Sequence, residues 1–253
     1  MKHLFFCLLA ASLSGCATVS RFEQGTTKIY SFRHDSTNAH LVVQGKNMVL
    51  VDSGYEENAE KLEQDIRDEG YDPAVLRAVI LTHGHADHAG GALHFQKKFG
   101  TKIVAGAGDR DMMAAGKNEK LCSTGFLGSI RHSTDQAGSY TPTKADVWVN
   151  APGELSLMTL AGLEGRVIAL PGHTRGSLVV TVGDAVFVGD LFRGSLLGSG
   201  AETHFYMCDV EGNRRDVARL LHEIAPHGQT FFVGHFGPVD RVSVAEHFAV
   251  PNP

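Results

Sequence analysis

The sequence predicts a layered α/β domain. Short apolar runs broken by glycine-containing turns indicate strands, and stretches with apolar residues on one face indicate amphipathic helices. The two kinds of element interleave in both halves of the chain, with neither a linker that would divide it nor an internal repeat. Interleaved strands and helices favour sheets covered by helices in one continuous domain.

The first half contains a hairpin, two helices and a strand buried on both faces. Continuous apolar residues at Ala78–Leu81 are typical of a strand that is covered on both sides. Ala59, Leu62 and Ile66 recur at helical spacing, and Gly70 ends that helix. The predicted elements are strands over 40–43 and 48–51, joined by a turn at 44–47, and helices over 56–69 and 88–99.

Residues 106–150 are rich in Gly, Ser, Thr and Asp and show no sustained period. We expect a long irregular insertion there, with one short helix near Asp109–Ala115, and such stretches are usually functional or disordered. The rest of the second half is more regular. It predicts strands over 166–170, 178–182, 185–188 and 230–233, and a helix over 213–225.

The composition is that of a soluble globular protein. Of the 253 residues, 43% are hydrophobic and 20% are charged, and the formal net charge is −5. The apolar fraction excludes low-complexity disorder, and four cysteines are too few for a disulfide scaffold. A mildly acidic chain lacks the basic surface that binds nucleic acid, so we expect a small-molecule substrate and no nucleic-acid partner. The sequence leaves the oligomeric state open.

The N-terminus differs in composition from the rest of the chain. A positive charge at Lys2 precedes an apolar run over 4–13 that is too short to span a bilayer. The segment Leu13-Ser14-Gly15-Cys16 then resembles the lipobox, where lipoprotein precursors are cut before the cysteine and acylated on it. The resemblance implies a signal peptide over 1–15, a tether over 16–27 and a single domain over 28–253.

The same resemblance implies export and a lipid anchor at Cys16. Ala17 is not the acidic residue that usually retains such proteins at the inner membrane, so we expect an outer-membrane lipoprotein that faces the periplasm. The alternative is a soluble secreted protein with a cysteine near its cleavage site. Cys122 and Cys208 remain in the mature chain, where they can form one disulfide or stay as two buried thiols.

Histidines gather in one short segment, 83–88 (His-Gly-His-Ala-Asp-His). His83 and His85, two positions apart on an extended turn, can point to the same side, while Asp87 and His88 can serve a second centre close by. Imidazole and carboxylate together suit zinc or another first-row metal. An isolated histidine is usually structural, but a dense buried cluster is costly without a metal. The segment therefore predicts a metal site.

Three further candidate ligands lie just beyond predicted strands. His173 follows the strand over 166–170, Asp190 follows 185–188 and His235 follows 230–233. A carboxylate such as Asp190 can bridge two metal ions through its two oxygens. We expect these side chains to converge with the segment 83–88 around a pair of metal ions.

Together these motifs resemble those of the metallo-β-lactamase-fold hydrolases. The segment 83–88 matches the HxHxDH signature of that family. Four other landmarks match in order: Val51-Asp52-Ser53-Gly54, Pro171-Gly172-His173-Thr174, Val188-Gly189-Asp190 and Val233-Gly234-His235. The match extends from about residue 28 to 238. The resemblance implies a four-layer αββα sandwich with metals at one edge.

The resemblance also implies a ligand set for two metal ions per chain, zinc by preference, with iron or manganese as alternatives. The first ion would be bound by His83, His85 and His173, the second by Asp87, His88 and His235, and Asp190 would bridge them. Asp52 resembles the family's supporting aspartate, which orients the ligands. Its simpler interpretation is a buried turn residue.

Such a centre favours hydrolysis of an activated acyl bond. Metal binding lowers the pKa of water to about 7 and polarises a carbonyl. Asp87 can orient the resulting nucleophile and pass a proton to the leaving group, which makes it the candidate catalytic residue. Esters, thioesters, lactones and lactams are the substrate classes that fit.

Asp190 indicates which branch of the family this chain resembles. Zinc β-lactamases carry Cys or Ser at the bridging position, whereas Asp190 resembles glyoxalase II and the lactonases. The chain ends at Pro253, shortly after His235, so we expect no helical glutathione-binding domain like that of glyoxalase II. A lactonase-like enzyme fits this length better, although Arg193 stands where many lactonases place an aromatic hydroxyl.

Two candidate substrate contacts lie near the Gly-rich loop over 194–200. Arg193 can hold a carboxylate, and Tyr206, which follows His204 and Phe205, can donate a hydrogen bond to a carbonyl. The simpler interpretations are a solvated surface arginine and a packing tyrosine.

Other functions share this pattern. The same fold with a single iron gives a sulfur dioxygenase, which metal analysis distinguishes from a dinuclear zinc enzyme. A β-lactamase and a non-catalytic metal-binding module are the remaining alternatives. The module is disfavoured because all seven ligands are present.

Overall fold

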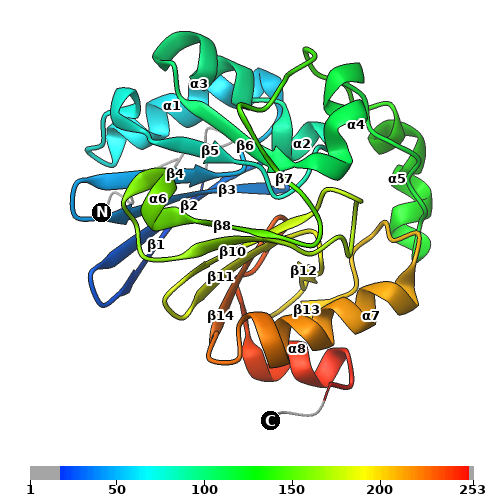
Figure 1. The fold of residues 1–253 in the computed structure, drawn as a ribbon. Helices are drawn as coiled ribbons and strands as arrows, with labels where there is room; N and C mark the ends of the chain where they lie inside the picture. The colour runs from blue at the N-terminus through cyan, green and yellow to red at the C-terminus, as the bar shows by residue number, and fades with distance from the viewer. Residues whose placement is uncertain (1–17, 251–253) are drawn as a thin grey trace, which may run out of the picture.

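The computed structural model describes residues 18–250. Across that range two mixed sheets pack face to face, with helices on both outer sides (Figure 1). This is the predicted αββα sandwich. The predicted signal peptide and the lipidated Cys16 lie outside the described residues. Among the described helices, none has the length and apolar character needed to span a bilayer.

The first sheet, as described within 18–250, has seven strands that follow one another in chain order. They are β1 (Thr18–Gln24), β2 (Thr27–His34), β3 (Thr37–Gln44), β4 (Asn47–Val51), β5 (Ala78–Ile80), β6 (Lys102–Gly106) and β7 (Val147–Val149). The strands β1 to β4 pair antiparallel, and β4 to β7 pair parallel.

The second sheet of the described chain has six strands in the order β15-β14-β11-β10-β9-β8. They are β8 (Glu154–Ser156), β9 (Arg166–Ala169), β10 (Leu178–Val182), β11 (Ala185–Gly189), β14 (Thr230–Val233) and β15 (Val239–Asp240). The neighbours β11 and β14 run parallel. A short separate ribbon pairs β12 (Arg193–Gly194) with β13 (Ala201–Glu202).

The helices lie mainly outside the two sheets, with α1 and α3 on the first sheet and α7 and α8 on the second (Figure 1). The α-helices are α1 (Ala59–Asp68), α2 (Ala86–Ala89), α3 (Ala92–Phe99), α4 (Arg110–Ala115), α5 (Phe126–Gln136), α6 (Leu157–Ala161), α7 (Val210–Arg219) and α8 (Arg241–His247). The shorter turns are η1 (Glu56–Asn58), η2 (Pro73–Val75), η3 (Ala107–Asp109) and the π-helical η4 (Leu220–Ile224).

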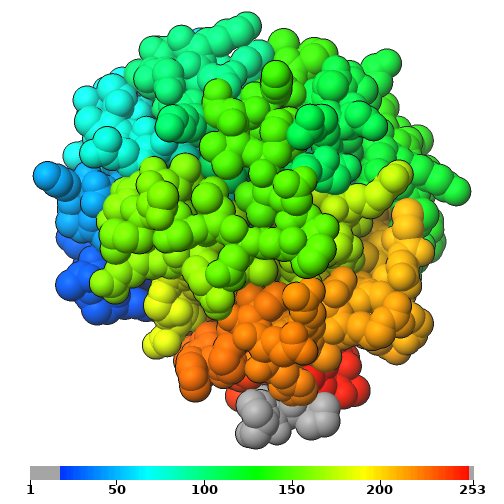
Figure 2. All heavy atoms as spheres, viewed as in Figure 1, coloured from blue at the N-terminus to red at the C-terminus, as the bar shows by residue number. Residues whose placement is uncertain are grey.

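Alternation along the strands produces three buried layers. In β4, Met48 and Leu50 pack in the cluster beneath α1 and α3, whereas Val49 packs between the sheets. In β11, Val186 packs in the cluster beneath α7 and α8, and Phe187 packs between the sheets. Because successive strand residues point to opposite faces, each sheet is buried on both. Figure 2 shows side chains closing over the gaps that separate the ribbons in Figure 1.

The predicted tether over 16–27 is wrong where the structure describes it. Thr18–Gln24 forms β1, which pairs with β2 from Thr18 opposite Arg33 to Gln24 opposite Thr27. The connection is a two-residue turn, in which Gly25 supplies a φ of 58°. Because β1 is largely exposed, it lacks the apolar run that indicates a buried strand.

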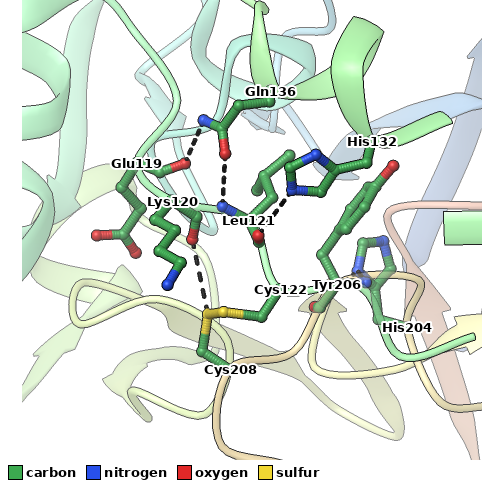
Figure 3. The surroundings of a disulfide bond; sticks show 9 residues. All are labelled: Glu119, Lys120, Leu121, Cys122, His132, Gln136, His204, Tyr206 and Cys208. Carbon is green, nitrogen blue, oxygen red and sulfur yellow. Dashed lines mark hydrogen bonds between the residues drawn. A yellow bond between two sulfur atoms is a disulfide. The ribbon is translucent and has the colours of Figure 1, made fainter. Parts of the chain in front are cut away.

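The insertion over 106–150 contains more regular structure than predicted. The short helix near 109–115 is confirmed as α4, but α5 and β7 also lie in this range. In α5, Phe126 and Ile130 are 79% and 62% exposed, so no buried face marks this helix in the sequence. Cys122, before α5, forms a disulfide with Cys208, before α7, which ties the insertion to the second half of the chain (Figure 3).

Candidate metal centre

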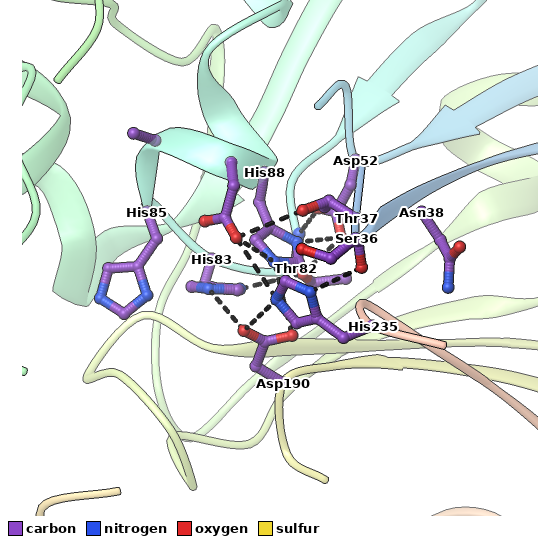
Figure 4. Close-up of polar contacts among 12 residues, drawn as sticks. Ser36, Thr37, Asn38, Asp52, Thr82, His83, His85, His88, Asp190 and His235 are labelled. Atoms are coloured by element: carbon purple, nitrogen blue, oxygen red, sulfur yellow. Dashed lines mark hydrogen bonds and ion pairs between the residues drawn. The ribbon is translucent and has the colours of Figure 1, made fainter. Parts of the chain in front are cut away.

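The predicted ligands meet where strands of both sheets end. His83 follows β5 of the first sheet, while Asp190 follows β11 and His235 follows β14 of the second. Figure 4 shows these side chains pointing into one shared space. His173 reaches the same space from the loop between β9 and β10.

Four overlapping groups of side chains in the described chain have donor atoms within 4.8 Å of one another. Three of the groups consist of predicted ligands alone. They are His83, His85 and His173; His83, His88 and Asp190; and Asp87, His88 and His235. The first and the third are the two ligand sets that the resemblance implies, and the second joins them through Asp190.

Asp190 lies between the two predicted ligand sets. Its Oδ1 is 3.4 Å from Nε2 of His88, and its Oδ2 is 3.7 Å from Nε2 of His83. The Oδ2 atom is also 3.3 Å from Nε2 of His235. The two carboxylate oxygens therefore reach ligands of both sets.

The donor atoms of the cluster fit a metal ion. Among the described residues, Nε2 of His83, Nε2 of His88 and Oδ1 of Asp190 are buried without a hydrogen-bond partner. A buried polar atom left unpaired costs about 1–3 kcal/mol. A cation among several such atoms would satisfy them together, and imidazole with carboxylate is a donor set for zinc.

Burial and the carboxylates shift the histidine pKa values in opposite directions. Burial lowers the pKa of His83 well below its ordinary value and lowers the pKa of His173 to about 3, so both rings are neutral. Burial would also lower the pKa of His235, but Asp190 and Asp87 raise it to about 10. Binding of a metal ion at Nε2 of His235 would release that proton, whereas the neutral rings of His83 and His173 have none to lose there.

Asp52 contacts the cluster from behind. Its Oδ2 accepts a hydrogen bond from Nδ1 of His88 at 2.9 Å. The backbone N–H and the hydroxyl of Thr82 also donate to Asp52, each at 2.7 Å, and that hydroxyl lies 3.1 Å from Nδ1 of His83. A hydrogen bond at Nδ1 fixes the tautomer and orientation that turn Nε2 of His88 toward a metal. These contacts suit the supporting role that the resemblance implies.

The turn between β2 and β3 positions His235. Nδ1 of His235 donates to the carbonyl of Ser36 at 2.8 Å. Nδ2 of Asn38 donates to the carbonyls of Val233 and Phe236, at 2.8 and 2.7 Å, on either side of His235. Figure 4 shows Ser36 and Asn38 at this turn. Sequence reasoning missed both residues because neither belongs to a motif.

Asp109 connects the segments that carry the first ligand set. It accepts hydrogen bonds from the N–H of Gly84 at 2.9 Å, the N–H of Gly176 at 2.8 Å and the hydroxyl of Thr174 at 2.8 Å. Burial raises the pKa of this carboxyl to about 6, although the hydrogen bonds oppose the shift. Asp109 lies at the start of the insertion, and no spacing pattern in the sequence marks it.

Two glycines next to ligands leave room for close packing. A Cβ atom at Gly234 would lie 2.2 Å from Oδ1 of Asp190 and 2.4 Å from Cε1 of His88. Gly189 has a φ of 53°, and a Cβ there would lie 2.4 Å from the hydroxyl of Thr82. Only glycine fits at these two positions without a shift of the metal centre.

A pocket opens to solvent beside the cluster. Asp87 and His235 line it together with Tyr55, Arg131 and Phe205. Asp87 is therefore accessible to a substrate, as its predicted catalytic role requires. Sequence reasoning missed Tyr55, which follows the Asp52 motif, and Arg131, which lies in the insertion.

Both candidate substrate contacts have partners within the protein. Tyr206 lines the pocket, but its hydroxyl donates to Oδ2 of Asp135 at 2.6 Å. Arg193 is buried rather than solvated, with its guanidinium 4.1 Å from the ring centre of Phe205 and paired with Glu202. Their roles in substrate binding stay predictions.

His204 is a further histidine of the cluster, outside the ligand motifs. Its Nε2 lies 3.0 Å from Oδ2 of Asp190, and it forms the fourth donor group with His173 and Asp190. Sequence reasoning placed it only behind the Gly-rich loop. A lone histidine there carries no spacing signal.

The profile of the Metallo-beta-lactamase superfamily matches residues 33–235. The chain belongs to this superfamily. The matched range includes every predicted metal ligand and Asp52. By fold and by ligand set, the chain is a metal-dependent hydrolase of this superfamily.

Relatives with similar sequences include two hydroxyacylglutathione hydrolases. GloC of Haemophilus influenzae is 31% identical over 156 residues, which cover 58% of this chain and 65% of that protein. The enzyme of Shewanella pealeana is 30% identical over 149 residues, which cover 59% of this chain and 42% of that protein. The probable metallo-hydrolase YqgX of Bacillus subtilis is 26% identical, over 66% of this chain and 74% of that protein. The chain thus spans less than two thirds of the length of both hydroxyacylglutathione hydrolases.

Solved structures share the fold. A metallo-beta-lactamase of Cronobacter sakazakii is similar with a TM-score of 0.62 and 20% identity, over 87% of both chains. BJP-1, a subclass B3 metallo-beta-lactamase of Bradyrhizobium japonicum, is similar with a TM-score of 0.59 and 19% identity, over 84% of this chain and 76% of that one. At this identity the likeness concerns the fold.

Proposed function

We propose that this chain is a dinuclear zinc hydrolase that cleaves an activated acyl bond in a small ester, thioester or lactone. The observation that carries the proposal is Asp190, whose two oxygens reach ligands of both sets. Zinc β-lactamases carry Cys or Ser at this position, so Asp190 favours a hydrolase of esters, thioesters or lactones over a β-lactamase. The two relatives named hydroxyacylglutathione hydrolases support the same branch.

The chain supplies the groups that such a reaction needs around the metals. When bound, two zinc ions supply a water of lowered pKa as the nucleophile and a Lewis acid for the carbonyl. Asp87 faces the pocket beside His235, with Oδ2 3.3 Å from Nε2 of that ring. Its carboxylate can orient the nucleophile, take its proton and deliver it to the leaving group.

Tyr55 provides a hydrogen-bond donor on the pocket wall. Burial, with a contribution from Asp87, raises the pKa of Tyr55 well above its ordinary value, so the hydroxyl keeps its proton across the physiological range. Tyr55 and Asp87 line the same pocket. The Tyr55 hydroxyl can therefore donate to an oxygen of the substrate while Asp87 acts on the nucleophile.

The proposal includes export and a lipid anchor at Cys16, with the enzyme at the outer membrane facing the periplasm. The lipobox-like segment ending at Cys16 is the basis for this location. The disulfide between Cys122 and Cys208 supports an oxidising compartment, because such bonds are rare in the cytosol of most organisms. Labelling of cells with a radioactive fatty acid tests the anchor, and Cys16→Ala should abolish incorporation.

Elemental analysis combined with a substrate panel tests the activity. We expect the purified full-length protein to contain two zinc ions per chain and to hydrolyse at least one of three substrate classes: activated esters, thioesters and lactones. His85→Ala should lose that turnover, whereas His227→Ala, an exposed histidine away from the cluster, should retain it.

The same experiment separates the alternatives. A single iron per chain, without hydrolysis, would favour the sulfur dioxygenase. Two metal ions without turnover of any of the three classes would favour a binding module and contradict the proposal.

A further inference from the structure

His204 is a buried imidazole at the metal centre that none of the predicted ligand sets includes. It is 3% exposed, and its ring centre lies 4.9 Å from that of His173 and 5.2 Å from that of His235. Its Nε2 approaches Oδ2 of Asp190 to 3.0 Å, closer than the 3.3 Å of His235. His204 thus lies as near to the bridging carboxylate as the predicted ligands do.

The donor atom of His204 points into the metal-binding space. His173, Asp190 and His204 satisfy the same distance limit of 4.8 Å as the predicted ligand sets. Among the described residues, Nε2 of His204 makes no well-aligned hydrogen bond, although Oδ2 of Asp190 is 3.0 Å away, and Nε2 of His83 and of His88 make none either. We propose that His204 binds metal through Nε2, as an eighth protein ligand on the side of His173.

The other ring nitrogen of His204, Nδ1, has a backbone partner that favours this role. Nδ1 of His204 lies 3.2 Å from the carbonyl oxygen of Tyr206. If Nδ1–H donates to that carbonyl, the lone pair of Nε2 is free for a metal, as is usual for metal-binding histidines. The N–H of Tyr206 is also 3.2 Å from Nδ1. Donation from that N–H instead requires a proton on Nε2, which then serves Asp190 as a hydrogen-bond donor.

The backbone that carries His204 is held by the insertion. The hydroxyl of Thr124 donates to the carbonyl of His204 at 2.5 Å, and the N–H of Thr124 donates to Phe205 at 2.9 Å. The Cys122–Cys208 disulfide joins the same two segments covalently, as Figure 3 shows together with Tyr206. The ring is therefore fixed at the cluster from outside both sheets.

The inference rests on the proposed metal centre, and cobalt substitution of the full-length protein tests it. An imidazole bound to Co²⁺ through one nitrogen carries a strongly shifted, exchangeable N–H proton on the other. We expect the wild-type NMR spectrum to show one such signal more than the five predicted histidine ligands supply. His204→Ala should lose one signal and should weaken the binding of one metal ion about 10-fold or more in chelator competition.

His132→Ala is the matched control, because His132 contacts the same segment through the carbonyl of Leu121 at 3.0 Å but lies outside the donor groups. It should keep every shifted signal. His204→Gln retains an N–H donor for Asp190, so full recovery of metal affinity in that variant would mean that His204 only positions Asp190.

The number of shifted signals in the wild-type spectrum shows whether His204 binds metal, even if His204→Ala does not fold. A protein that binds two cobalt ions and shows five shifted signals overturns the inference but leaves the metal centre intact. A protein that binds no cobalt at all overturns the proposed metal centre itself.

Discussion

Asp52 lies behind the metal centre and is hydrogen-bonded to one ligand directly and to another through Thr82. Its backbone has a φ of 60°, a conformation that Asp tolerates better than most residues. Asn at this position would keep the shape of the Asp52 side chain but would be a weaker hydrogen-bond acceptor, so it should hold His88 less firmly.

We therefore expect Asp52→Asn to lower metal affinity by about 10- to 100-fold. Competition with a calibrated chelator measures the effect. Asp184→Asn, at an exposed turn, is the control and should leave affinity unchanged. Equal affinities for the two variants would show that Asp52 is a turn residue with no part in ligand orientation.

Asp109 makes a pH-dependent contribution to stability. Burial raises its pKa from 3.8 to about 6 in the folded chain. Because the folded state then holds the proton more tightly than the unfolded state, this contribution is full below about pH 4 and is lost as the pH rises to about 6.

Asp109→Asn replaces the carboxyl by a neutral amide, which removes this titration. In chemical unfolding of metal-free protein, the free energy of unfolding of wild type relative to Asp109→Asn should fall between about pH 4 and 6. A difference that stays constant across this range would contradict the assignment.

At the scale of elements, the disulfide fixes α5 and the His204 segment to each other. Cys122 and Cys208 are 86 positions apart. A crosslink that closes a loop of that length lowers the entropy of the unfolded chain and so raises the free energy of unfolding by about 4–5 kcal/mol. The double variant Cys122→Ser/Cys208→Ser should therefore have a clearly lower Tm in thermal unfolding.

Reductant is the control for this prediction. It should lower the Tm of the wild type toward that of the double variant and leave the double variant unchanged. A wild-type Tm that does not respond to complete reduction would mean that the crosslink contributes no stability.

The elements that sequence could predict are those with a strong local pattern. The buried runs of β10, β11 and β14 are continuous and apolar, and the predictions over these ranges are confirmed within a residue or so. In contrast, β1 is exposed along most of its length, and α5 exposes Phe126 and Ile130. Such elements depend on partners distant in sequence, so their own residues show little periodicity.

The residues of the site also divide into those that a sequence motif marks and those that no motif marks. The ligands in segment 83–88 and those next to glycine at strand ends follow motifs, and the structure brings them together. His204 and Asp109 take their places through long-range packing of the insertion and of the loop after β11, and Tyr55 reaches the pocket from the loop after β4. No spacing rule relates these residues to the ligands, so the sequence alone did not indicate them.

At the scale of the whole molecule, the metal centre links the two sheets. His83 comes from the end of a first-sheet strand, and Asp190 and His235 come from ends of second-sheet strands. Without metal, the unpaired donor atoms destabilise the junction, and with metal they become ligands.

Removal of metal should therefore lower the Tm of the entire domain in one cooperative transition. When the free metal concentration is 1,000-fold above Kd, binding raises the free energy of unfolding by about 4 kcal/mol per ion. Differential scanning calorimetry after dialysis against a chelator measures the loss, and added zinc should restore the original Tm. An unchanged Tm in verified metal-free protein would exclude a stabilising role for the centre.

The central claim is that two metal ions lie between the sheet ends, bridged by Asp190. Crystallography of the zinc-loaded protein with anomalous data collected at the zinc edge tests this most directly. We expect two anomalous peaks about 3.5–4 Å apart, one beside His83, His85 and His173 and the other beside Asp87, His88 and His235, with Asp190 between them. A single peak, or two peaks not bridged by Asp190, would contradict the claim.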